Sequence, residues 1–127
     1  ALDVGVIDLF SGGADFIKIG SPYSFVVTKD AVKIVEGSSL PLGILDELHP
    51  TVCKTELHSG DVVVFVSDGI SDAFGSSSDF IDFLSAQRAL NPKSLADNIL
   101  EKALLLDGQV AKDDMTAFCV RIFKKAS

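Results

Sequence analysis

Several residue types that mark particular kinds of site are scarce in this sequence. Among 127 residues there are two cysteines, one tyrosine, one methionine and no tryptophan. Cys53 and Cys119 lie in separate strand-like segments, and we expect reduced core thiols there rather than a structural disulfide. There is no Cys-x-x-Cys or paired-histidine motif, which argues against a zinc site.

Basic residues are also scarce. The 11 lysines and arginines are outnumbered by 18 aspartates and glutamates, which gives a net charge of -7 and a pI near 4.6. Nucleic acids and anionic membranes both require basic patches, so neither is an expected partner of this segment. An acidic surface would also repel a phosphorylated substrate unless a metal ion or a local lysine or arginine offset the charge.

Long apolar runs are missing as well. No run approaches the roughly 20 residues that a transmembrane helix needs, and there is no secretory signal. Hydrophobic residues make up 47% of the chain and charged residues 23%, a balance typical of one globular domain with its own core. Because the sequence begins at Ala1 within a strand-like segment and without a methionine, we expect it to be part of a longer protein.

The first two-thirds of the sequence predicts three antiparallel β-hairpins, because short apolar or alternating segments are separated by turn residues. The predicted pairs are residues 2–9 with 14–19, residues 25–28 with 32–35, and residues 52–57 with 62–67. The stretch 40–43 contains Pro41 and Gly43 and is predicted to be a loop.

After Ser78 the apolar spacing changes from that of a strand to that of a helix. Ser78 and Asp79 can cap a first helix, and Asn91 followed by Pro92 predicts the start of a second, which Gly108 would end. The predicted buried positions are Phe80, Phe83, Leu84 and Leu90, then Leu95, Ile99, Leu100, Ala103 and Leu104. A last strand would run to residue 122. Hairpins, then two helices, then one strand predict an α+β fold rather than a doubly wound parallel sheet.

Two acidic segments border predicted strands and form the candidate site. Asp68 follows the apolar run 62–66 and precedes Gly69, while Asp113–Asp114 precedes the β-type run 115–120. Carboxylates suit hard divalent cations such as Mg²⁺ and Mn²⁺, and a sheet can bring two strand ends together. The glycine would let water or substrate approach. Asp-Gly is also common in plain turns, and Asp-Asp in solvated corners.

These acidic segments resemble those of a known family. Ser67-Asp68-Gly69, followed by Asp113-Asp114-Met115-Thr116, is similar to the C-terminal part of a metal-dependent protein Ser/Thr phosphatase of the PPM, or PP2C-like, superfamily. Further stretches resemble its bacterial SpoIIE subgroup, and together they cover nearly the whole chain in order. They are residues 7–9, 18–22, 40–44 and 60–63. We therefore expect residues 1–127 to be the C-terminal portion of one such domain, a partial α-β-β-α sandwich.

The resemblance also implies a site. Family members bind two divalent cations, Mn²⁺ or Mg²⁺, which hold the water that attacks a phosphoserine or phosphothreonine. The metal-ligand aspartates of the family correspond to Asp68 and Asp113. Asp114 would support these ligands, and Gly69 would allow close approach without taking part in the chemistry. The resemblance implies no catalytic residue beyond the metal ligands, and it leaves the substrate-binding residues unknown.

The sequence departs from the family pattern in two places. The early Asp-Gly element, whose aspartate bridges both metals, has no counterpart, because Asp8 is not followed by glycine. We therefore expect this chain alone to be inactive or nearly so. Where many relatives have Gly-Asp-Ser-Arg, residues 20–23 read Gly-Ser-Pro-Tyr, and SpoIIE-type sequences share this lack of the aspartate. Missing strands would also leave open sheet edges, which favour pairing with a second copy of the chain.

The resemblance implies a phosphorylated anti-anti-sigma factor as the substrate, in the control of sigma factors during sporulation or stress. It implies a cytoplasmic domain, whose parent is membrane-anchored in the sporulation branch. Two non-catalytic functions are open at this point. A phosphoacceptor receiver places an aspartate after an apolar strand but needs alternating βα units, and a pseudophosphatase would keep the fold as a binding scaffold.

Overall fold

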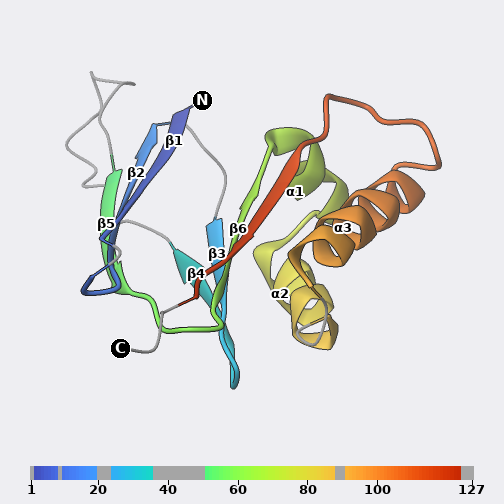
Figure 1. Cartoon of the computed structure of the whole chain (residues 1–127). Coiled ribbons are helices and arrows are strands. Elements are labelled where there is room, and N and C mark those ends of the chain that lie inside the picture. The colour runs from blue at the N-terminus through green and yellow to red at the C-terminus, as the bar shows by residue number, and fades with distance from the viewer. Residues whose placement is uncertain (1, 9, 20–23, 36–50, 88–90, 124–127) are drawn as a thin grey trace.

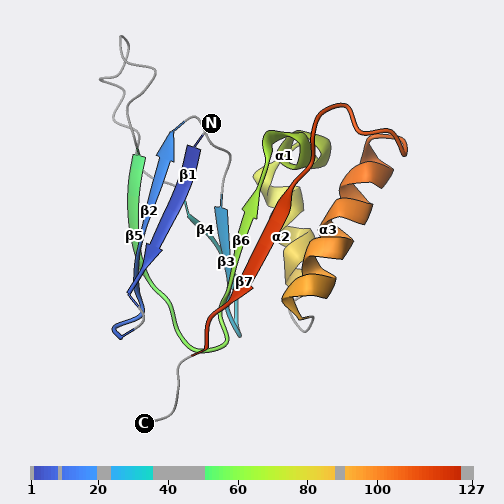
Figure 2. The ribbon, with the colours of Figure 1, turned by 45° about the horizontal axis from the view of Figure 1, so that its top comes forward.

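The computed structural model describes residues 2–8, 10–19, 24–35, 51–87 and 91–123. They form three layers, in which two β-sheets face each other and helices cover the outer face of the second sheet (Figure 2). The predicted α+β class is confirmed. The expected loop at residues 40–43, the buried position Leu90 and the family-like stretches at residues 20–22 and 40–44 lie outside the described residues.

The first sheet contains β1 (Leu2–Ile7), β2 (Gly13–Ile19) and β5 (Thr51–Glu56), in the order β1-β2-β5. All its pairs are antiparallel, with Gly5 opposite Phe16 and Phe16 opposite Cys53. The predicted first hairpin is therefore confirmed. Its turn is held by Asp8, whose carboxylate accepts hydrogen bonds from the N–H groups of Phe10 at 2.8 Å and Ser11 at 3.3 Å.

The second sheet contains β3 (Ser24–Val27), β4 (Val32–Val35), β6 (Val62–Val66) and β7 (Ala117–Arg121), in the order β4-β3-β6-β7. It is antiparallel throughout. The predicted second hairpin and the predicted last strand are both confirmed. Strand β6 occupies an inner position between β3 and β7, which explains why its residues are almost all buried.

The predicted pairing of residues 52–57 with 62–67 is wrong. Strand β5 pairs with β2, and β6 lies in the other sheet (Figure 1). Instead of folding back, the chain continues along the first sheet to Leu57, which is buried and donates its N–H to the Gly12 carbonyl at 2.6 Å. Alternating polarity identifies a strand but not its neighbour, and here the short connection crosses between sheets.

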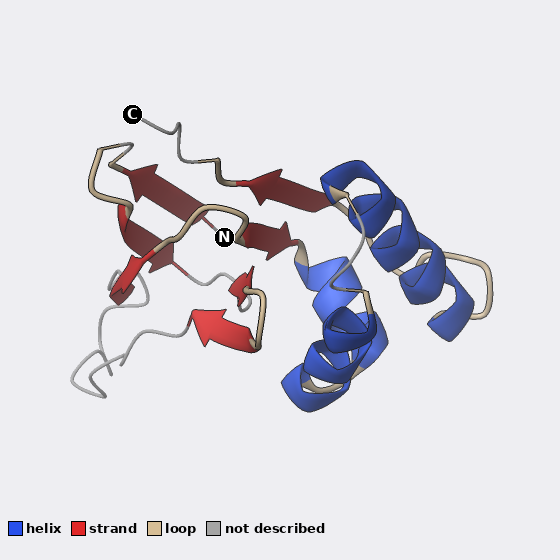
Figure 3. Cartoon of the chain, turned by 60° about the horizontal axis from the view of Figure 1, so that its bottom comes forward, coloured by secondary structure: helices blue, strands red, loops and turns tan. Residues whose placement is uncertain are grey.

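Three helices follow β6: α1 (Asp68–Phe74), α2 (Ser77–Ala86) and α3 (Pro92–Leu106). The prediction of two helices missed α1. Figure 3 shows all three on one side of the strands. Helix α2 is capped by Ser76, slightly earlier than predicted, through its hydroxyl and the Asp79 N–H at 3.1 Å. Helix α3 begins after Asn91 as predicted, and Gly108 follows its end with a φ of 76°.

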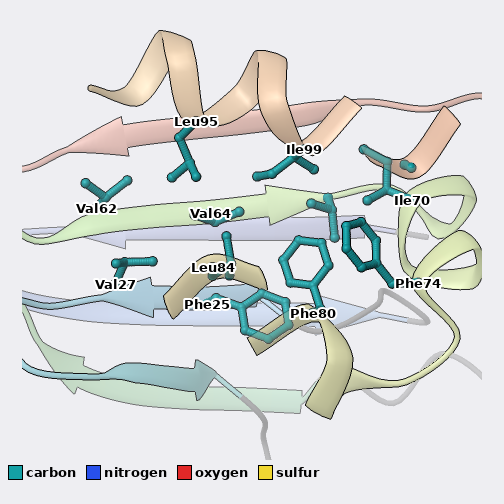
Figure 4. Packing of buried hydrophobic residues seen from close by; sticks show 12 residues of the cluster. Phe25, Val27, Val62, Val64, Ile70, Phe74, Phe80, Leu84, Leu95 and Ile99 are labelled. Carbon is teal, nitrogen blue, oxygen red and sulfur yellow. The ribbon is translucent and has the colours of Figure 1, made fainter. Parts of the chain in front are cut away.

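The hydrophobic core has two parts, one on each face of the second sheet. Between the sheet and the helices, the side chains of alternate β6 residues pack against those of α1, α2 and α3 (Figure 4). On the other face, Phe16, Val26 and Val63 are among the buried residues between the two sheets. Because β6 contributes to both parts, the position of its C-terminal end is tightly fixed.

Two further sequence expectations concern cysteines and membrane spans. Cys53 in β5 and Cys119 in β7 are partly buried and are not joined in a disulfide. Within the described part of the chain, the helices are too short or too polar to cross a bilayer.

Candidate metal centre

The ends of β6 and β7 bring the two acidic segments together at one edge of the second sheet. The strands pair as far as Val66 opposite Ala117. One step further, the N–H of Ser67 donates to the carbonyl of Thr116 at 3.0 Å. Beyond this contact lie Asp68, which begins α1, and, on the far side of Met115, Asp113–Asp114, which lead into β7. The expectation that a sheet joins these strand ends is met.

Gly69 shows how closely the two segments approach. A Cβ atom at this position would overlap with the carbonyl oxygen of Asp114 and would lie 3.2 Å from that of Asp113. Only a residue without a side chain fits there, so the predicted close approach is real. Its partner is different, however. The sequence suggested that water or substrate would approach the glycine, whereas the backbone of Asp114 occupies that space.

The three acidic side chains are accessible to solvent. Asp68, Asp113 and Asp114 are all exposed. The Oδ1 atom of Asp113 accepts a hydrogen bond from the N–H of Asp114 at 2.8 Å. This bond restrains one oxygen of the Asp113 carboxylate. The main-chain amide of Asp114 therefore holds the Asp113 carboxylate, while the supporting role suggested for Asp114 itself stays a prediction.

The chemistry of these donors fits a hard divalent cation in part. Two exposed carboxylates at one edge are the protein ligands that Mg²⁺ commonly uses, with water filling the other positions. Among the residues that the structure describes, no group of three or more His, Cys, Asp or Glu side chains gathers to hold a metal. The described residues thus present two acidic corners in contact, rather than a complete cage of protein ligands.

Ser67 received no role from the sequence. The signal was present, because a serine stands directly between a buried strand and Asp68. Its hydroxyl bonds to residues on both sides of Met115, which no local pattern predicts.

Comparisons with known proteins show which proteins this chain resembles. Stage II sporulation protein E of Bacillus subtilis is 31% identical over 125 residues, which cover 95% of this chain and 15% of that protein. The manganese-soaked structure of its phosphatase domain superposes with a TM-score of 0.83 at 28% identity, covering 99% of this chain and 58% of that one. The RsbU and RsbW domains of Rv1364c from Mycobacterium tuberculosis give a TM-score of 0.77 at 25% identity, covering 98% and 36%.

The chain spans a minor part of the curated relative and little more than half of the solved phosphatase domain. The family model for stage II sporulation protein E (SpoIIE) matches residues 1–123. The antiparallel sheets, the helical layer and the two acidic corners described above all belong to this matched range. The chain is therefore a member of the SpoIIE family and carries part of a PP2C-type Ser/Thr phosphatase domain.

Proposed function

We propose that this chain forms part of a metal-dependent protein Ser/Thr phosphatase in which Asp68 and Asp113 are ligands to Mn²⁺ or Mg²⁺. The observation that carries the proposal is the backbone contact between Gly69 and Asp113–Asp114, which joins two predicted ligands from distant parts of the sequence. When bound, such ions supply a water of lowered pKa and neutralise charge on the phosphoryl group.

The residues of this chain would bind the cation and orient its ligands. Asp68 and Asp113 offer exposed carboxylates, and the Asp114 amide restrains Asp113. The net charge of -7 opposes the approach of a phosphorylated substrate. Binding of a phosphoprotein at this edge would therefore depend on a cation already held by the aspartates. The choice between Mn²⁺ and Mg²⁺ is left to titration with each ion.

The proposed substrate is a phosphorylated regulatory protein of the anti-anti-sigma factor type, in the control of sigma factors during sporulation or stress. Support comes from similarity to the phosphatase domain of a sporulation protein and to a structure with RsbU and RsbW domains. Because this chain spans 58% of that phosphatase domain, catalysis and substrate binding are proposed for the longer protein. The placement of the parent protein at a membrane is part of the same proposal.

The fold argues against one of the two non-catalytic alternatives and is compatible with the other. A receiver domain needs alternating βα units around a parallel sheet, whereas every strand pair among the described residues is antiparallel. A pseudophosphatase would have this same fold, so the distinction from an active domain depends on metal binding and turnover.

The first test is calorimetric titration of Mn²⁺ into the chain and its variants Asp68→Ala and Asp113→Ala. Asp82→Ala is the matched control, because Asp82 is an exposed aspartate on α2, away from the strand ends. Loss of binding in both site variants and not in the control would place the two carboxylates in one site. Binding that neither site variant changes would refute the assignment.

A phosphopeptide assay in Mn²⁺ tests the expected inactivity of the chain alone. The family's bridging aspartate has no counterpart in this sequence, so we expect little or no release of phosphate even where Mn²⁺ binds. Robust turnover that disappears in Asp68→Ala would show that the 127 residues suffice for catalysis.

A further inference from the structure

The hydroxyl group of Ser67 links the two acidic corners directly. Its Oγ atom accepts a hydrogen bond from the N–H of Thr116 at 2.9 Å and donates one to the carbonyl of Asp114 at 3.2 Å. The partners are 49 and 47 positions away in sequence. One side chain at the end of β6 therefore holds the backbone on both sides of Met115.

These bonds replace a bond that the sheet would otherwise make. In a regular antiparallel ladder, Ser67 and Thr116 would exchange two main-chain hydrogen bonds. The first is present, from the Ser67 N–H to the Thr116 carbonyl. The Ser67 carbonyl instead accepts from the N–H groups of Ile70 and Ser71, at 3.0 and 3.2 Å, and so begins α1. The hydroxyl takes the place of that carbonyl as acceptor for Thr116.

A serine at this position would ordinarily serve a different purpose. Ser67 is the N-cap residue of α1, and N-cap serines typically accept a hydrogen bond from the first turn of their own helix. Here the N-cap side chain makes no such bond, whereas Ser76 and Asn91 do cap α2 and α3. The Ser67 hydroxyl is thus used across the sheet instead of along its helix.

We propose that Ser67 is a positioning residue, which sets the distance between the Asp68 and Asp113 carboxylates and so the affinity for the divalent cation. This inference rests on the proposed function. The connection runs through two hydrogen bonds. Ser67 holds the carbonyl of Asp114, and the N–H of Asp114 holds the Asp113 carboxylate. Ser67 is therefore the covalent neighbour of Asp68 and is linked to Asp113 through these two hydrogen bonds.

The test compares Ser67→Ala, Ser67→Thr and Ser71→Ala with the wild-type chain. Ser71 is the matched control, because its hydroxyl donates to the Asp68 carbonyl within α1 at 3.2 Å and, among the described residues, makes no hydrogen bond to the β7 side. Removal of groups that orient metal ligands typically weakens metal binding about 10- to 100-fold. We expect Ser67→Ala to weaken Mn²⁺ binding by about that factor, with Ser67→Thr near wild type and Ser71→Ala unchanged.

Amide hydrogen exchange without metal gives a second, independent measurement. Ser67→Ala should accelerate exchange at Thr116, which loses its acceptor, while Ser71→Ala should not. Equal Mn²⁺ affinity in Ser67→Ala and Ser71→Ala would overturn the inference, even if both lowered the melting temperature. If the wild-type chain binds no Mn²⁺, the proposed metal site fails for this chain, and unchanged exchange at Thr116 would then overturn the positioning role separately.

Discussion

Gly69 and Asp114 are in contact through their backbones, with the Asp114 carbonyl oxygen in the space that a Cβ atom at Gly69 would need. The neighbour is main chain and is tied to Ser67, so it cannot rotate away as a flexible side chain would. The contact makes the start of α1 and the segment before β7 one unit. A substitution at Gly69 should therefore shift the positions of both Asp68 and Asp113.

Substitution Gly69→Ala should destabilise the chain by about 1–3 kcal/mol, the usual cost of forcing extra atoms into a packed site. It should also weaken Mn²⁺ binding, because the added methyl group pushes Asp113–Asp114 away from Asp68. Urea unfolding and calorimetry measure the two effects. Gly13→Ala is the control, since its nearest neighbour would be the Ser11 hydroxyl at 3.2 Å. Equal effects at both glycines would contradict the role of the contact.

The core between α3 and the second sheet should be sensitive to truncation on one face of the helix only. Ile99 is completely buried there (Figure 4), so Ile99→Ala should cost about 2–5 kcal/mol in unfolding free energy. Leu105 lies on the same helix and is 55% exposed, and Leu105→Ala should cost much less. Comparable losses in urea unfolding would show that α3 does not pack as described.

Burial raises the pKa of the Cys119 thiol to about 11. Between an unfolded-state value near 9.0 and this folded-state value, the unfolded chain loses a proton that the folded chain keeps. Stability should therefore fall as the pH rises through this window. Urea unfolding at about pH 8 and about pH 10.5 measures the loss, and Cys119→Ala should lose less. An identical loss in the variant would assign the effect to other groups.

The edge strands β1 and β7 border an apolar cavity of about 350 Å³ between the sheets, lined by Gly5, Ile7, Val63, Phe65, Phe118 and Val120. Phe118 is 58% exposed. We expect this edge to support dimerisation of the chain, as predicted from sequence, since unprotected edges and apolar surface recruit partners. In sedimentation velocity, Phe118→Lys should shift the chain toward monomer. Phe10→Lys, at a 93% exposed turn position, should not, and a wild-type monomer at high concentration would refute the expectation.

Local pattern was sufficient for those elements whose partners are near in sequence. The hairpins β1–β2 and β3–β4 and the caps at Asn91 and Gly108 follow from turn and cap residues that act within a few positions. The pairing of β5 with β2 instead joins strands that are distant in the sequence, and Leu57, just after β5, is buried between the sheets. Nothing within residues 52–67 distinguishes that course from a hairpin.

Helix α1 escaped prediction for a related reason. It has seven residues, contains a glycine and lacks a side-chain cap, so its intrinsic helical tendency is weak. Its stability comes from Ile70 and Phe74, spaced by four positions and buried in the core. The candidate site, too, could be predicted from the sequence only in part. The acidic residues are visible in the sequence, whereas the contacts of Ser67 and Gly69 that join them appear only in three dimensions.

The place of β7 in the second sheet has a consequence for how the protein assembles. The strands of the first sheet all lie within residues 2–56. In the second sheet, β7 can pair with β6 only after α1, α2 and α3, which lie between them in the sequence, have been synthesised. Closing so long a loop is entropically costly and slow compared with forming a hairpin. Asp113 therefore reaches Asp68 only when the last strand docks. A cation bound by both residues would stabilise that docked form by mass action, so metal concentration would influence the completion of folding as well as any activity.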